Sequence, residues 1–467
     1  MAISPKIPSH VNDTTATRVL LHLYGLEFGL VLLVFGLYKA PEYDLALLSS
    51  PPGIVIAVGL VCVATAAWRL FKSPHLTRRA FAIGLSTHLV SLVVTLGIAE
   101  SVLRMVAFET DDEIRIGSTP LRPTWSETVA RNRAAVEPSS SPRRDSYFVY
   151  DRDLGWTVGP NRRSKDGLYF SSAEGIRSPR IGIRYADDPI RPRVALIGDS
   201  NAFSLEVPFG DSLGSHLQTV LGEATQVLNF GVNGYGIDQI YLRYQRDVRP
   251  WKPDVVVVVF IEHDLIRTMG VYPFVSLGWT GLLVKPRFDL NDDNLSNVNE
   301  PLPSQEQILS TPSVEQLPAI ELDPGFDERD WALRLEHLPY LLRLVTSTFP
   351  RWRSRDEQQL SEETQALNSR LFHELNKSIL RQGSVPIFVY LPRWTGHDDL
   401  TPSTLRRASI AAMDMTACLQ AVPEDRRRVP GGSHYTGIGN EALGRCTAPA
   451  IRSALSTKAS ASPNQAP

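Results

Sequence analysis

The sequence predicts an α/β protein: a three-layer domain in which a parallel sheet is flanked by helices, preceded by three transmembrane helices. Two patterns support this prediction. Long apolar segments fill much of the first 107 of the 467 residues, and short β-branched runs alternate with amphipathic helical stripes from residue 191 onward. Charged residues make up only 21% of the chain, below the roughly 25% of soluble domains, and the apolar N-terminal part accounts for the deficit.

The composition excludes several classes of protein. The 48 Lys and Arg residues are balanced by 50 Asp and Glu residues, so the chain lacks the basic surplus of a nucleic-acid-binding protein. Three cysteines are too few for a disulfide scaffold or a cysteine-rich zinc module. A hydrophobic content of 43% excludes wholesale disorder. We therefore expect a membrane-associated protein with a globular domain and no nucleic-acid partner.

Three apolar segments, at about 19–38, 53–71 and 80–102, each approach the roughly 20 residues needed to cross a bilayer. The third is the clearest, because residues 80–99 contain no Asp, Glu, Lys or Arg. None of the segments shows the polar face of a soluble amphipathic helix. Two spans beside one buried helix remain an alternative.

Loop charges predict the orientation of these spans. The loop after the second segment carries Arg69, Lys72, Arg78 and Arg79, and positive charge is typical of cytoplasmic loops. Three crossings then place the N-terminus in the cytoplasm and the chain after about Phe108 outside it. This predicts a multi-pass inner-membrane protein with a periplasmic domain.

Four ionisable side chains fall within or at the ends of the predicted spans: His22, Glu27, His88 and Glu100. Such residues are costly in lipid, and many of them mark functional sites. We favour the simpler interpretation that they form hydrogen bonds between helices or, for Glu100, lie at the membrane interface.

The outer part of the chain divides into a lead-in and an α/β domain. Residues 108–190 are predicted to be an extracytoplasmic lead-in and linker, with a Pro/Ser/Arg-rich stretch at 137–144. The domain covers 191–455 and contains an insertion at about 266–349, which is either a lid or binding segment or is disordered. Residues 456–467 are of low complexity and are predicted to be disordered.

Four short apolar runs predict parallel strands: 193–198, 227–230, 254–261 and 385–391. Apolar helical stripes separate them, at 213–221, 237–248 and 360–379. Ligands of such a sheet bind beyond the carboxyl ends of the strands. The segments that follow the first three strands, or precede the last helix, are GDSN (198–201), GVNGYG (231–236), EHDL (262–265) and GSHYT (432–436).

Two of these segments offer a serine and a histidine. The hydroxyl of Ser200 becomes a strong nucleophile only when a base takes its proton, and His434 is the candidate base. The backbone N–H groups of Ser200 and Gly234 are suited to bind the oxyanion that attack on an ester creates. Glycine at 234 also lets the backbone approach a substrate closely. This combination predicts acyl-ester chemistry.

The four segments, in this order, resemble the SGNH/GDSL hydrolase superfamily. Two upstream segments are similar to the extension that precedes the hydrolase domain in many bacterial members: DLGWTVGPN (153–161) and SSAEGIRSP (171–179). The resemblance covers about residues 145–455. It implies an SGNH-like fold with Ser200 as nucleophile and first oxyanion donor, Gly234 as second donor and His434 as general base.

Two positions depart from the family pattern. The family's Gly-Asn-Asp block is matched by Glu-His-Asp at 262–264, so the resemblance implies that His263 stands in for the third oxyanion donor. The family's Asp, three residues before the histidine, is matched by Gly431. One solution is a Ser-His dyad oriented by a backbone carbonyl, and another is that Glu424 or Asp425 folds back to the histidine.

Other polar residues have simpler expected roles. Asp199 and Asp264 are expected to form turns and helix caps. Cys418 and Cys446 both lie in the outer domain, where a disulfide is possible, and the sequence leaves their pairing open. Cys62 is expected to be a small packing residue in a span.

These features predict a serine-dependent acyl-ester hydrolase or O-acetyl transferase that acts outside the cytoplasm on a carbohydrate or glycan. A transferase would need a membrane partner to supply the acyl group. His263, Asp264 and His434 lack the spacing of a known metal site, so neither a metal nor a cofactor is expected. Two alternatives remain: a catalytically silent domain that binds a glycan or an assembly partner, and a lipid esterase.

Overall fold

The computed structural model describes most of the chain in two units. The residues described are 11–39, 51–72, 78–109, 114–121, 124–136, 147–187, 190–277, 279, 281–291, 294–326, 328, 339–348, 357–392 and 398–461. The predicted linker stretch at 137–144 lies outside them. Each unit is considered by itself below.

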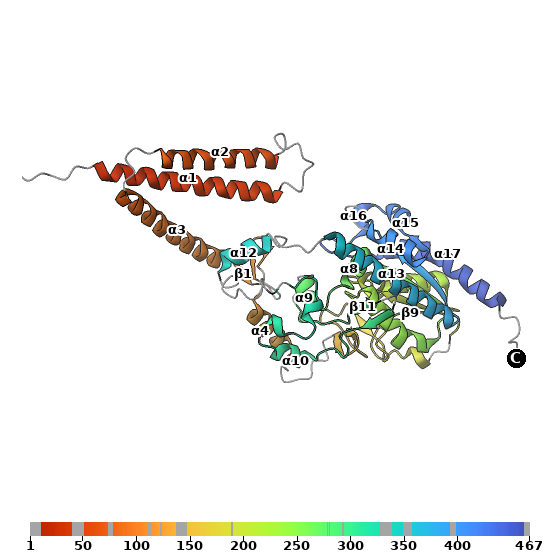
Figure 1. The fold of residues 1–467 in the computed structure, drawn as a ribbon. Coiled ribbons are helices and arrows are strands. Elements are labelled where there is room, and N and C mark those ends of the chain that lie inside the picture. The colour runs from red at the N-terminus through yellow and green to blue at the C-terminus, as the bar shows by residue number, and fades with distance from the viewer. Residues whose placement is uncertain are drawn as a thin grey trace, which may run out of the picture. The chain divides into compact units, whose positions relative to one another are not determined.

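The first unit consists mainly of three long helices, α1 (Val11–Lys39), α2 (Pro51–Phe71) and α3 (Arg78–Val106). All three segments predicted as spans are therefore helical (Figure 1). Within the described residues one helix is long and apolar enough to cross a membrane, Phe81–Val106, with a mean hydropathy of 1.9. The apolar stretch Ile54–Leu70 is shorter. Of the three spans expected from the sequence, one is thus found as a candidate.

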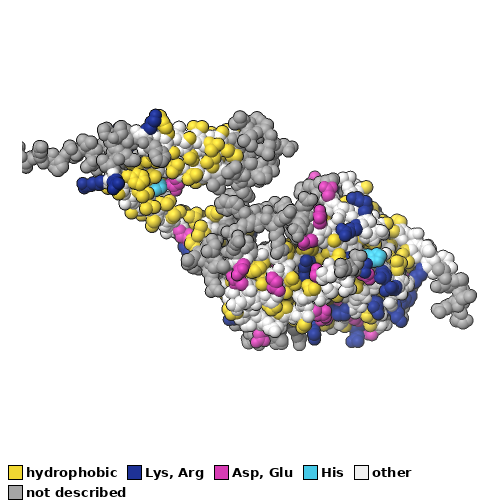
Figure 2. Space-filling model, in the orientation of Figure 1, with side chains coloured by type: hydrophobic (Ala, Val, Ile, Leu, Met, Phe, Trp, Pro, Cys, Tyr) yellow, Lys and Arg dark blue, Asp and Glu magenta, His cyan; other side chains and the backbone are white. Residues whose placement is uncertain are grey.

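Exposed apolar side chains gather over α2 and α3 (Figure 2). Between helices, small residues allow close contact: a Cβ added at Gly29 of α1 would lie 2.9 Å from the Cβ of Cys62 in α2. Cys62 therefore packs as expected. Glu27 and His88 form an ion pair between α1 and α3, with 3.6 Å between Oε2 and Nε2. This agrees with the interpretation of these ionisable residues as contacts between helices.

Glu100 near the C-terminal end of α3 binds a segment that the sequence analysis assigned to the insertion. Its carboxylate accepts the N–H groups of Tyr340 and Leu341, both at 2.9 Å, at the start of helix α12 (Tyr340–Thr348). Arg104 forms an ion pair with Glu100 at 2.6 Å. Residues 339–345 therefore belong to the first unit and not to the α/β domain.

The second unit is built on a seven-stranded sheet in the order β14-β13-β10-β8-β9-β7-β6. Its five parallel strands are β8 (Arg193–Gly198), β9 (Gln226–Asn229), β10 (Val255–Phe260), β13 (Val385–Tyr390) and β14 (Ala412–Asp414). Numbered along the chain, these strands have the order 2-1-3-4-5, which is that of a doubly wound sheet whose ligand site lies where the order reverses. Here the reversal falls between β8 and β10.

Helices cover both faces of this sheet (Figure 1). Val255, Val257 and Val259 of β10 share a core with α6 (Leu213–Leu221) and α17 (Gly437–Ala461). The alternating residues of the same strand share the opposite core with α7 (Ile237–Arg243) and α13 (Glu357–Arg381). Since successive strand residues point to opposite faces, this arrangement confirms the predicted three-layer architecture. Shorter helices lie between these strands or after them: α5 (Ser200–Phe203), α8 (Glu262–Arg267), α14 (Leu400–Ala408), α15 (Thr416–Gln420) and α16 (Glu424–Arg427).

The lead-in is not a linker over residues 147–187. Its strands β6 (Phe170–Ser171) and β7 (Arg177–Ser178) extend the sheet beyond β9 in antiparallel fashion. Leu154 and Trp156 are buried in the same core as α7 and α13. This segment is therefore part of the α/β unit. Its other strands are β4 (Phe148–Asp151) and β5 (Gly155–Val158), and the short strands before it are β1 (Phe108–Glu109), β2 (Ile114–Ile116) and β3 (Thr119–Pro120).

The insertion, which the sequence left as either a lid or binding segment or a disordered one, folds into helices and strands where the structure describes it. It contains α9 (Pro273–Ser276), β11 (Phe288–Asn291), β12 (Asn294–Asn297) and α10 (Gln305–Ser310), with its own apolar core. Helix α4 (Trp125–Val136) packs on it, because Trp125 Nε1 donates to the carbonyl of Thr311 at 3.0 Å. The buried Lys285 ammonium pairs with Asp238 in α7 and so attaches the insertion to the domain.

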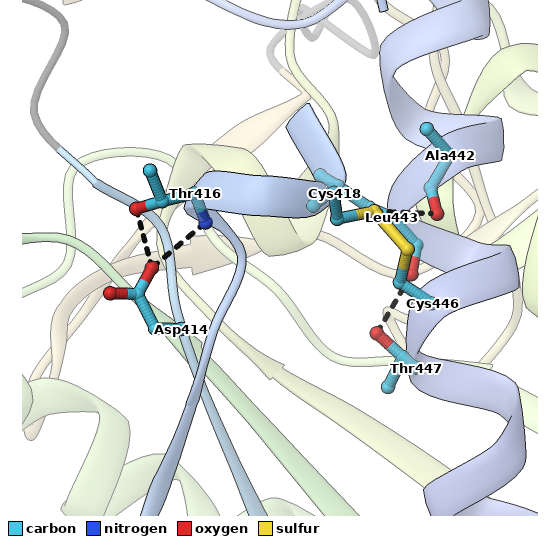
Figure 3. Close-up of a disulfide and its surroundings, with 7 residues drawn as sticks. All are labelled: Asp414, Thr416, Cys418, Ala442, Leu443, Cys446 and Thr447. Carbon is cyan, nitrogen blue, oxygen red and sulfur yellow. Dashed lines mark hydrogen bonds between the residues drawn. A yellow bond between two sulfur atoms is a disulfide. The ribbon is translucent and has the colours of Figure 1, made fainter. Parts of the chain in front are cut away.

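Two findings concern the C-terminal part. Helix α17 continues to Ala461, so the tail predicted to be disordered from residue 456 is helical over its first six residues. Cys418 and Cys446 form a disulfide that joins α15 to α17 (Figure 3). The Asp414 carboxylate accepts the N–H of Thr416, the first residue of α15, at 2.8 Å.

Candidate active site

Ser200 lies at the carboxyl end of the central strand β8, at the first position of helix α5. Asp199 caps this helix by accepting the N–H of Asn201 at 2.8 Å, which is the capping role expected from the sequence. The Ser200 side chain donates its hydroxyl proton to Asp199 Oδ2 at 3.2 Å. The serine is therefore fixed where the strand order reverses.

Two backbone N–H groups near this serine are available as donors. Among the hydrogen bonds of the described residues, none uses the N–H of Ser200 or of Gly234. Gly234 has a φ of +76°, and a Cβ added there would lie 2.3 Å from the ring of Trp279. Only glycine fits this position, because both the backbone conformation and the close tryptophan exclude a side chain.

Aromatic residues fix the loop that carries Gly234. Trp156 from the lead-in donates its indole N–H to the carbonyl of Asn233 at 2.8 Å. The Tyr235 hydroxyl donates to the carbonyl of Trp156 at 2.6 Å. Trp279, from the insertion, lies 6.0 Å from the Trp156 ring, centroid to centroid, and is half-buried. Lead-in and insertion thus both shape this side of the site.

His434 lies just before α17, and a carboxylate holds it. Its Nδ1 is 3.1 Å from Oε1 of Glu206, which lies six residues after Ser200. Oε2 of the same carboxylate accepts the N–H groups of Ser433 and His434 at 3.1 and 3.2 Å. The His434 side chain is 12% exposed and that of Glu206 is 30% exposed, so the pair is largely shielded from water. Glu206 is therefore the carboxylate that lies at Nδ1 of His434.

The loop at 203–207 that presents Glu206 has an unusual backbone. Ser204 and Glu206 have φ angles of +61° and +70°. For a residue with a Cβ, this left-handed conformation costs roughly 1–2 kcal/mol, so surrounding contacts must hold it. Tyr169 contributes one such contact, because its hydroxyl accepts the Glu206 N–H at 2.8 Å.

Arg177 of the lead-in supplies further contacts to this loop. Its guanidinium donates to the carbonyls of Ser204 and Val207, both at 2.6 Å, and also to that of Phe203. It lies over the ring of Phe203, 4.4 Å from the centroid. Burial lowers the pKa of Arg177 to about 10, so the group stays charged at neutral pH.

His263 lies in the first turn of α8, after β10, and is exposed. Its neighbour Asp264 is buried, accepts the N–H of Ile261 at 3.0 Å and pairs with Arg267 at 2.6 Å. Burial and the nearby Asp199 carboxylate raise the pKa of Asp264 well above its usual value. Asp264 therefore acts as the helix cap that the sequence predicted. The role of His263 as an oxyanion donor stays a prediction.

The structure brings some of the expected residues together and not others. The Ser200 carbonyl accepts the N–H of Leu205 at 2.9 Å, so Ser200 and Glu206 belong to one short hydrogen-bonded loop. Within the described part of the chain, the Ser200 hydroxyl and His434 make no direct hydrogen bond. Glu424, one of the acids proposed from the sequence, is exposed on α16.

Sequence reasoning did not identify Glu206, Tyr169 or Arg177 as parts of the site. One signal was available: Glu206 is a single acidic residue within the otherwise uncharged stretch FSLEVPF. The stretch SSAEGIRSP, which was noted for its resemblance, contains Arg177 but gives no hint of its contacts. For metals, no cluster of three or more His, Cys, Asp or Glu residues suited to an ion occurs in the part of the chain that the structure describes.

Comparison with known proteins gives matches of structure but not of sequence. No family model matches the chain, and no curated protein matches it. A lipase/acylhydrolase from Enterococcus faecalis is similar at 12% identity, over 56% of this chain and 96% of that one, with a TM-score of 0.29. An acetyl xylan esterase from Geobacillus stearothermophilus is similar at 13% identity, over 54% and 91%, with a TM-score of 0.27.

A protein assigned to the lipolytic G-D-S-L family, from Desulfitobacterium hafniense, is similar at 11% identity over 55% of this chain and 98% of that one, with a TM-score of 0.27. The strand order 2-1-3-4-5 by itself defines a doubly wound α/β sheet. The roles of individual residues are inferred below from the geometry of this chain.

Proposed function

We propose that this chain is a membrane-anchored, serine-dependent hydrolase or transferase of acyl esters. The observation that carries the proposal is the arrangement at the carboxyl edge of the sheet. A serine follows the central strand, its own N–H and that of Gly234 have no acceptor among the described residues, and His434 is held at Nδ1 by a carboxylate. Nucleophile, oxyanion donors and oriented base are the parts that acyl transfer requires.

In the proposed reaction, His434 Nε2 takes the proton of the Ser200 hydroxyl as Oγ attacks the carbonyl carbon of the ester. The N–H groups of Ser200 and Gly234 stabilise the negative charge on the carbonyl oxygen. The protonated His434 then gives its proton to the leaving alcohol, and an acyl-enzyme remains. Water, or an acceptor hydroxyl in a transferase, releases the acyl group in the reverse sequence of proton transfers.

The substrate that we propose is an acetyl ester on a carbohydrate or glycan outside the cytoplasm. Trp279, half-buried beside Gly234, offers an aromatic surface of the kind that packs against a sugar ring or an acyl group. A silent binding domain is a weaker alternative, because Glu206 supplies the orienting acid that the sequence pattern lacked.

We also propose the periplasmic location and the three spans expected from the sequence. The apolar helix Phe81–Val106 supports membrane association. The disulfide between Cys418 and Cys446 supports an oxidising compartment, since disulfides persist outside the cytoplasm. A transferase at this location would depend on a membrane partner that delivers the acyl group.

The experiment uses the full-length chain in detergent or nanodiscs. Hydrolysis of an aryl acetate and labelling by a fluorophosphonate are measured for the wild type and for Ser200→Ala. We expect both signals in the wild type and their loss in the variant, by about 10⁴-fold for hydrolysis. Labelling without hydrolysis would favour the transferase, to be tested with an acetylated oligosaccharide donor. Hydrolysis that persists in Ser200→Ala would refute the serine mechanism.

A further inference from the structure

The contacts of Glu206 extend the proposed function and depend on it. We infer that Glu206 is the orienting acid of the site, reached from the loop after the nucleophile, and that Tyr169 and Arg177 of the lead-in hold it in place. The sequence pattern of the family places such an acid three residues before the histidine, where this chain has Gly431. The inference therefore assigns positioning roles to three residues that lie outside the motifs.

The contacts of His434 at Nδ1 select one tautomer of its ring. A base that takes the serine proton at Nε2 must carry its own proton at Nδ1. With that proton present, Nδ1 donates to Glu206 Oε1 at 3.1 Å, and the Ser433 hydroxyl, 3.2 Å from the same nitrogen, accepts as well. Both partners lie on the Nδ1 side, which leaves Nε2 for the serine.

The carboxylate of Glu206 binds both the ring and the backbone of His434. It accepts three N–H groups: His434 Nδ1 and the backbone N–H groups of Ser433 and His434. Hydrogen bonds to a carboxylate are stronger than those between neutral groups. The carboxylate thereby fixes both the imidazole ring and the backbone that carries it. When His434 becomes protonated during the reaction, the carboxylate at Nδ1 stabilises the positive charge.

Two residues of the lead-in hold the loop that carries Glu206. Glu206 reaches His434 from a left-handed backbone conformation that is uncommon for a residue with a side chain. The Tyr169 hydroxyl accepts the Glu206 N–H, and the buried Arg177 guanidinium binds carbonyls on both sides, at Ser204 and Val207. The lead-in thus helps to form the site.

Steady-state kinetics of the full-length chain with an aryl acetate tests this inference. Glu206→Gln keeps the size of the side chain and an oxygen acceptor for the backbone N–H groups, but it removes the charge. We expect kcat to fall by about 10²-fold with KM changed by less than about twofold, because the acid stabilises the imidazolium and does not contact substrate. Glu206→Asp keeps the charge and should retain more activity than Glu206→Gln.

Two further variants keep the inference falsifiable. Tyr169→Phe removes only the hydroxyl that accepts the Glu206 N–H, and it should lower kcat several-fold at unchanged KM. The double variant Glu424→Gln/Asp425→Asn removes the two acids proposed from the sequence, and its kcat should equal that of the wild type. A thermal melt of each protein verifies folding.

The outcomes separate this inference from the proposed function. If Ser200→Ala abolishes activity while Glu206→Gln and Tyr169→Phe both behave as wild type, Glu206 is not the acid and the serine mechanism stands. The same holds if Glu424→Gln/Asp425→Asn lowers kcat and Glu206→Gln does not. If Ser200→Ala keeps its activity, both proposals fail together.

Discussion

His434 and His263 stand in the two segments that depart from the family pattern, and their surroundings differ. His434 is largely shielded, and Glu206 holds its Nδ1. His263 is exposed in the first turn of α8, beside a buried aspartate that caps that helix. At the first departure, an acid from another part of the chain lies at Nδ1 of the histidine. At the second, the histidine side chain is exposed to solvent.

This comparison shows that a missing motif residue does not by itself indicate a missing function. An orienting carboxylate must reach Nδ1 of the histidine, but its position along the chain is free. An oxyanion donor must lie where negative charge develops, and a group exposed to water contributes less there than a shielded one. We therefore expect the two histidines to differ strongly in their contribution to the rate.

The largest effect is expected for His434→Ala. Without a base to take the serine proton, kcat/KM for an aryl acetate should fall by about 10³–10⁴-fold, comparable with the loss in Ser200→Ala. The double variant Ser200→Ala/His434→Ala should lower kcat/KM little more than either single substitution does, because the two residues act as a unit. A double variant whose losses multiply would contradict their joint action.

Gly234→Ala should lower kcat by about 10²-fold, the usual cost of losing one oxyanion donor. The added methyl group would meet Trp279 at 2.3 Å, so the backbone must move and take its N–H away from the substrate. Trp279→Ala combined with Gly234→Ala relieves the contact and should recover part of the loss, as measured by kcat. Normal activity in Gly234→Ala alone would show that this N–H is not a donor.

His263→Ala should lower kcat by about tenfold, less than for a shielded donor, because the side chain is exposed. His263→Asn restores the residue of the family pattern and should equal or exceed the wild-type rate. An unchanged kcat in His263→Ala would remove the residue from the oxyanion site and sharpen the contrast with His434.

The smallest effect is expected for Gly431→Asp, which restores the family's acid where this chain has none. A Cβ at this position has no neighbour within 4 Å, so the side chain fits, although the φ of +72° disfavours it slightly. With Glu206 already at Nδ1, kcat should change by less than about threefold. A large gain would mean that Glu206 leaves the histidine poorly oriented.

The strands and helices around the site could be predicted because their signals are local. A buried parallel strand such as β8 or β10 is a continuous apolar run, and its flanking helices show apolar residues on one face. For the same reason, the sequence alone predicted that Ser200 follows one strand closely and that Gly234 lies in the loop after the next strand. In the lead-in, the strands that extend the sheet, β6 and β7, are only two residues long, which is too short to give such a signal.

The acid could not be predicted for a related reason. Glu206 and Ser433 are 227 positions apart, and their contact exists only because α17 and the 203–207 loop meet at the edge of the sheet. The left-handed backbone at Glu206 depends on Arg177, which lies on yet another segment. A local pattern of residues cannot record a contact that three distant segments create.

The contact between Gly234 and Trp279 has a consequence for protein engineering. The ring occupies the space in which a side chain at 234 would begin, so the insertion and the loop after β9 are matched in shape. An insertion grafted from a relative would bring its own residue to position 279 and would either leave a gap or collide with the loop. Exchange of the insertion therefore requires that the loop after β9 be transferred with it.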